Sequence, residues 1–91
     1  MTEELPKIDF ATFVLSMSHS ALIQLGVAPD PETKKAEANL PLARQTIDLL
    51  GVIEEKTRGN LNGDEERLLG QILFDLRMRV VELEKAVKAK G

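Results

Sequence analysis

The sequence predicts an all-α protein, either a three-helix bundle or a helical hairpin with a long C-terminal helix, with helices over about residues 9–25, 40–57 and 63–89. Three observations support this prediction. Apolar residues recur every three or four positions through the last third of the chain. Residues that start or stop helices flank each apolar segment. The connection between the last two segments is short enough to make them antiparallel neighbours.

Length and composition limit the size and class of the protein. A chain of 91 residues is one small domain, 1–91, and hides only about 60–65% of the surface that its unfolded form exposes. It therefore packs a small core or shares one with another chain. The chain has no cysteine, which excludes disulfides and thiolate zinc sites and fits a cytoplasmic location. The net charge of −3 and the absence of Trp and Tyr argue against a nucleic-acid partner.

The first helix is predicted over residues 9–25, after a frayed lead-in at 1–8 that carries no signal-peptide pattern. Asp9 is the predicted N-cap, and Gly26 and Pro29 end the helix. No charged side chain occurs from Phe10 to Pro29. Several polar residues and the early stop argue against a transmembrane segment, so we expect a helix that protein covers on most sides. Its apolar residues are Phe10, Phe13, Val14, Leu15, Met17, Ala21, Leu22, Ile23 and Leu25.

Residues 28–39 are predicted to form an exposed linker because they contain Pro29, Pro31 and a run of charged residues. The second helix begins near Asn39, with Pro41 in its first turn, where a missing amide hydrogen costs nothing. Its apolar side consists of Leu42, Ala43, Ile47, Leu49, Leu50 and Ile53.

The turn between the second and third helices carries the clearest local signals. Gly59 and Asn60 both tolerate positive φ angles. Leu61 is placed to pack back across the bend, and Asn62 is the predicted N-cap of the third helix. Glu65 follows Asn62 by three positions, which is the spacing of a capping box.

The third helix, which we expect to organise the rest of the chain, has an apolar seam that predicts a coiled-coil homodimer. Its residues alternate in spacings of four and three, with leucine at the d positions. The seam residues, taken as the candidate oligomer interface, are Leu69, Leu73, Leu76, Val80, Leu83 and Val87. Beyond Val80 the first two helices are too short to cover this surface. The competing arrangement is a monomer whose seam packs entirely on the first helix.

The chain resembles a bacterial family of small all-helical domains of unknown function. The most specific part of the resemblance is the block Lys56-Thr57-x-Gly59-Asn60-Leu61, followed by Glu65, Glu66 and the leucine-rich stretch 68–77. The segments 25–26 and 47–50 look like two earlier blocks of the family, and the resemblance covers most of residues 10–82. Asn62 stands where the family usually has threonine, and Val80 where it often has an aromatic residue. The family has no established activity, so the resemblance implies a fold and no function.

No motif in the chain predicts catalysis, a cofactor or a metal site. His19 lies among serines but has no third group to orient its imidazole. The spacing from Gly51 to Lys56 and Thr57 lacks the second glycine and the preceding strand of a phosphate-binding loop. Asp48 is expected to be exposed or to pair with Arg77 or Arg79, on the neighbouring helix or on a second chain.

These observations do not identify a biological role. They favour a non-catalytic structural or protein-interaction module that forms a helical homo-oligomer and that has a further protein partner. The alternative is a small helical bundle that binds an apolar ligand or docks at a membrane surface.

Overall fold

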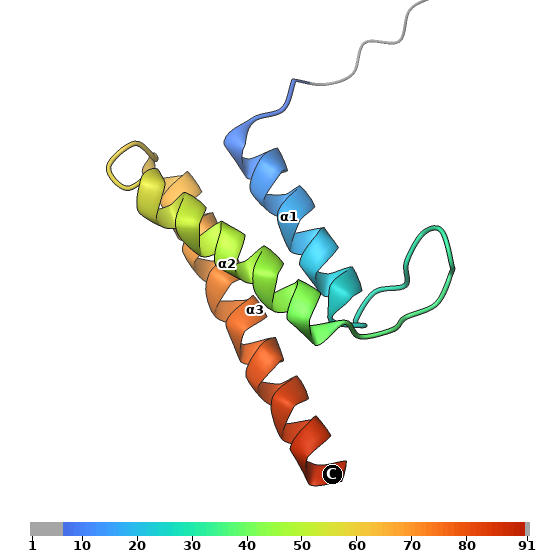
Figure 1. The fold of residues 1–91 in the computed structure, drawn as a ribbon. Helices are drawn as coiled ribbons and strands as arrows, with labels where there is room; N and C mark the ends of the chain where they lie inside the picture. The colour runs from blue at the N-terminus through green and yellow to red at the C-terminus, as the bar shows by residue number, and fades with distance from the viewer. Residues whose placement is uncertain (1–6, 91) are drawn as a thin grey trace, which may run out of the picture.

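The computed structural model describes residues 7–90 and contains three helices: α1 (Phe10–Gln24), α2 (Leu40–Lys56) and α3 (Gly63–Lys90). The described part of the chain has no β-strand, so the all-α prediction is confirmed. Figure 1 shows α2 and α3 as an antiparallel hairpin, with α1 packed on it and the end of α3 projecting past the start of α2. Of the predicted lead-in, residues 1–6 lie outside the described part, and Lys7 and Ile8 are exposed.

The helix ends lie where the sequence predicts them because their capping residues are local. Asp9 accepts a hydrogen bond of 2.8 Å from the Thr12 amide. This bond holds the pKa of the Asp9 carboxyl below its ordinary value. Asn39 caps α2 by accepting from the Leu42 amide at 3.2 Å. Gly26, which was predicted to end the first helix, lies just after α1 and has a φ of 78°.

The connection from α1 to α2 is exposed over residues 31–39 and contains a turn but no helix. Its ends are held together, because the Asn39 amide donates to the Gln24 carbonyl at 2.6 Å. Gly26 also lies close to the returning chain: a Cβ at this position would be 3.0 Å from the Ala38 amide nitrogen. This position therefore requires glycine both for its φ angle and for the close approach.

The core lies where the three helices meet, and each helix contacts the other two. The buried apolar residues are Val14, Ala21, Leu25, Ala43, Ile47, Leu50, Leu69, Leu73, Leu76 and Val80. One polar side chain, Thr46, is buried with them, and its hydroxyl donates to Gln24 Oε1 at 2.6 Å. The bond satisfies a polar group that would otherwise destabilise the core.

Helix α1 is covered less completely than the sequence suggests. Val14 and Ala21 are buried, but Leu15 is 53% exposed and Phe13 39% exposed. The α2–α3 hairpin can contact only one side of α1 within a single chain, so the opposite side is left open. That side is uncharged because its exposed polar residues are Thr12, Ser16, His19 and Ser20.

Candidate interaction surface

The structure buries most of the predicted seam of α3 within the chain itself. Leu69, Leu73 and Leu76 are each 1% exposed, and Val80 is 9% exposed. Burial then falls off toward the end of the helix: Leu83 packs partly against the core and Val87 is 58% exposed. Only these last two residues of the candidate oligomer interface have surface left for a second copy.

A different apolar strip on α3 is exposed. Phe74 is 69% exposed, Met78 44% and Val81 42%. Their spacing of four and then three residues places them within about 60° of one another around the helix. The same spacing is readable in the sequence, but the longer leucine seam dominates the pattern. A strip of this kind is unusual on the surface of a helix that already buries another face.

A groove of about 290 Å³ lies beside this strip, between α2 and α3. Its floor is apolar and its rim is charged. The lining residues are Arg44, Ile47, Asp48, Arg77, Val80 and Val81. Gly51 makes room for the Arg77 guanidinium, since Nη2 lies 3.3 Å from where a Cβ would be. Arg44 crosses the groove to Glu84 at 2.7 Å.

Asp48 is exposed, which is one of the two arrangements that the sequence predicts for it. None of the three ion pairs among residues 7–89 includes Asp48. Arg79 pairs instead with Asp75 of its own helix at 2.9 Å. Arg77 shares the groove with Asp48 but lies against Gly51. Among the described side chains, the Asp48 carboxylate is therefore exposed at the rim of the groove without an ion-pair partner.

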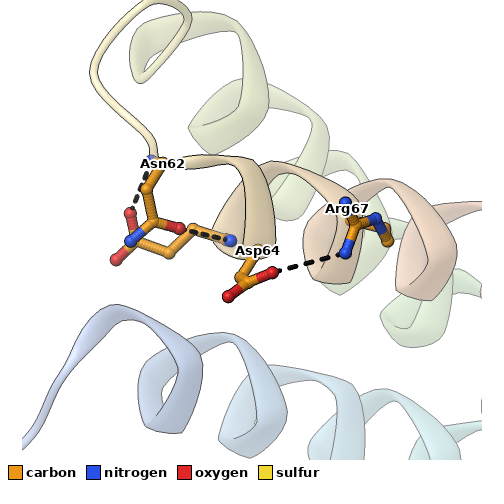
Figure 2. Close-up of polar contacts among 4 residues, drawn as sticks. Asn62, Asp64 and Arg67 are labelled. Carbon is orange, nitrogen blue, oxygen red and sulfur yellow. Dashed lines mark hydrogen bonds and ion pairs between the residues drawn. The ribbon is translucent and has the colours of Figure 1, made fainter.

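The turn between α2 and α3 forms the predicted capping box, which Figure 2 shows. The Glu65 amide donates to Asn62 Oδ1 at 2.8 Å, and the Asn62 amide donates to Glu65 Oε1 at 3.0 Å. In the first turn of α3, Asp64 Oδ1 lies 3.3 Å from Arg67 Nη1. Leu61 packs against the core, and Gly59 has a φ of 88°. These contacts explain the turn residues structurally.

A second cavity, of about 360 Å³, adjoins this turn. Its lining includes Thr57, Gly59 and Leu61 of the family-like block, together with Glu54, Arg58, Glu66 and Leu69. The Thr57 hydroxyl is already used, since it donates to the Ile53 carbonyl at 2.7 Å. Two carboxylates and one guanidinium give the rim mixed charge, so it does not select a ligand of one sign.

Neither His19 nor the acidic side chains of the described residues form a metal-binding cluster. His19 is exposed on α1 beside Ser16 and Ser20. Within residues 7–90 no three His, Cys, Asp or Glu side chains gather in a way that could hold a metal ion. None of the helices described is long and apolar enough to cross a membrane.

The fold defines a small all-helical protein in which a helical hairpin carries a shorter helix on one face. The family model "Domain of unknown function (DUF1844)" matches residues 7–82, and the chain belongs to this family. No curated protein and no solved structure matches the chain. The match ends at residue 82, so the family model covers Phe74, Met78 and Val81 and leaves out Leu83 and Val87.

Proposed function

We propose that this protein is a non-catalytic structural or protein-interaction module that forms a helical homo-oligomer, in the simplest case a homodimer. The observation that carries the proposal is the exposed strip Phe74, Met78 and Val81 on a helix whose other face already forms the core. Exposing three large apolar side chains side by side is unfavourable in water, and such patches commonly mark protein interfaces.

The extent of the molecule supports the same proposal. Its accessible surface is 7001 Å², whereas a compact monomer of 10.1 kDa exposes about 5,300 Å². The Cα radius of gyration is 15.2 Å, against about 12 Å for a compact domain of this length. The exposed connection over residues 31–39 and the end of α3 contribute to this excess, and a typical stable interface covers about 800 Å² on each partner.

The apolar-ligand alternative has weaker support. Arg44, Asp48 and Arg77 rim the groove between α2 and α3, and Glu54, Arg58 and Glu66 rim the cavity at the turn. Ligand pockets of small helical proteins are usually concave and mostly apolar. The proposal further includes a bacterial origin, supported by the family-like block at residues 56–61, and a cytoplasmic location, supported by the absence of cysteine.

The mass of the full chain in solution tests the proposal. Light scattering on the eluting protein should give twice the chain mass of 10.1 kDa. Repeated over a range of concentrations, the measurement should show the mass falling toward that of one chain on dilution. A mass of one chain at every concentration would contradict the homo-oligomer.

A further inference from the structure

We infer that a second copy of the chain docks on the face of the α2–α3 hairpin that faces away from α1, so that the two hairpins form an antiparallel four-helix bundle. This inference rests on the proposed homo-oligomer and specifies its surface and arrangement. The proposed interface is not the leucine seam, most of which is already buried within the chain. It is a face of the hairpin on which the two helices carry complementary charge.

The α3 side of this face is apolar and basic. Phe74, Met78 and Val81 form its apolar strip, and Lys85 continues the same line because it follows Phe74 by three helical turns. Arg77 borders the strip on the side of the groove. Both cations are exposed.

The α2 side of this face is acidic apart from Arg44, which lines the groove and pairs with Glu84 of α3 within the same chain. Asp48, Val52 and Glu55 are all exposed, and Val52 is 51% exposed. Their spacing of four and then three residues is the spacing of the α3 strip, so they lie within about 60° of one another. The buried residues Ile47 and Leu50 lie on the other side of α2. The groove between the two strips has no α1 residue in its lining.

Charge selects one arrangement of the two copies. A two-fold axis parallel to the helices places α2 of each copy on α3 of the other, so the acidic strip meets the basic strip. A two-fold axis across the helices would place α3 on α3 and α2 on α2, and would bring Arg77 and Lys85 near their own equivalents. Like charges placed together across an interface are strongly unfavourable, so the first arrangement is favoured. Both axes give a bundle in which neighbouring helices are antiparallel, so the charges alone distinguish the two arrangements.

The contacts within one chain set the levels at which the strips meet. Arg44 pairs with Glu84, and Gly51 lies against Arg77, so the level of Asp48 is between those two contacts. An axis parallel to the helices preserves this level in the second copy. Val52 then packs between the second copy's Phe74 and Met78, and Asp48 meets the second copy's Arg77. This contact uses the Asp48 carboxylate, which has no ion pair within residues 7–89.

Exchange of the two charges between chains tests the inference. Asp48→Arg and Arg77→Asp, prepared separately, should each weaken dimer formation at least tenfold because each puts like charges together between copies. An equimolar mixture of the two variants should regain the mass of the parent dimer, because both contacts then join an arginine of one chain to an aspartate of the other. Each variant chain still has like charges at positions 48 and 77. A dimer that forms again in the mixture therefore indicates that these positions meet between copies and not within one chain.

A second set of variants keeps the inference testable if the charge variants lose their helix content. Phe74→Glu should give a folded monomer, whereas Leu15→Glu, at an exposed apolar residue of α1, should keep the parent mass. Two results would overturn this arrangement but not the homo-oligomer. One is a mixture of the charge variants that stays monomeric, and the other is a dimer that persists in Phe74→Glu but is lost in Val87→Glu. A monomeric parent would overturn both.

Discussion

Leu76 and Val87 belong to the same sequence seam, yet the structure predicts a large loss of stability when Leu76 is shortened to alanine and almost none when Val87 is. Leu76 is 1% exposed and Val87 is 58% exposed. Leu76→Ala removes buried methyl groups and leaves a cavity, which costs about 2–5 kcal/mol. Val87→Ala removes little buried surface, and alanine favours the helix more than valine, so its free energy of unfolding should stay within about 0.5 kcal/mol of the parent.

The difference is large relative to the stability of the protein. Proteins have a free energy of unfolding of roughly 0.05–0.15 kcal/mol per residue, which gives about 5–14 kcal/mol for a chain of 91 residues. Leu76→Ala therefore removes a large share of the total. Urea unfolding followed by circular dichroism, with all proteins at one concentration, should show a midpoint more than about 1 M lower for Leu76→Ala, given a slope of roughly 1–2 kcal/mol per M.

Two results would refute this reasoning. Equal losses of stability for the two variants would mean that the end of α3 is covered as fully as its middle. A folded Leu76→Ala protein with half the mass of the parent would mean that Leu76 lies between copies rather than in the core of one chain. The folded fraction of this variant should instead keep the mass of the parent under the same conditions.

Three further predictions follow from local geometry. Asn62→Ala should lower the free energy of unfolding by about 1 kcal/mol, because the Glu65 amide loses its acceptor, whereas Asn62→Gly should cost only a few tenths in the same urea assay. Gly26→Ala should cost more than about 1 kcal/mol, because its φ is positive and its Cβ would meet the returning chain. Gly70→Ala, mid-helix with open space around the new methyl group, should instead raise the free energy of unfolding by about 0.5–1 kcal/mol; equal effects at the two glycines would contradict the structure. Because the folded-state pKa of Asp9 is lowered, its stabilising effect is present at neutral pH and is lost as pH falls below about 4 and through the lower pKa of the folded state. Asp9→Asn should flatten that part of the curve of stability against pH.

The helix ends were predictable because the interactions that fix them are short-range. The carboxylate of Asp9 reaches an amide three residues away, and Asn62 and Glu65 exchange hydrogen bonds over the same interval. Gly26 and Gly59 adopt the positive φ angles that their positions after helices require. In each case the partner group is fixed by the sequence spacing, so no knowledge of the tertiary fold is needed.

The covering of α1 was less predictable because a lack of charge does not show how many sides of a helix are buried. Leu15 and Phe13 are as apolar as Val14, but only Val14 points toward the hairpin and is buried. The sequence shows that no charge needs solvation on this helix. It does not show that two neighbouring helices can contact only one of its sides.

The same limit applies to α3, where it decides which surface is free. Spacings of three and four residues indicate that a stripe is buried, but a coiled-coil partner and a neighbouring helix of the same chain produce the same stripe. Because α1 and α2 pack on the stripe from Leu69 to Val80, the seam is used inside the chain. The shorter strip of Phe74, Met78 and Val81 then gains its meaning from the structure, since it stays exposed after the core is complete. The candidate interface between copies is therefore the short apolar strip that the fold leaves exposed, and not the longest apolar pattern in the sequence.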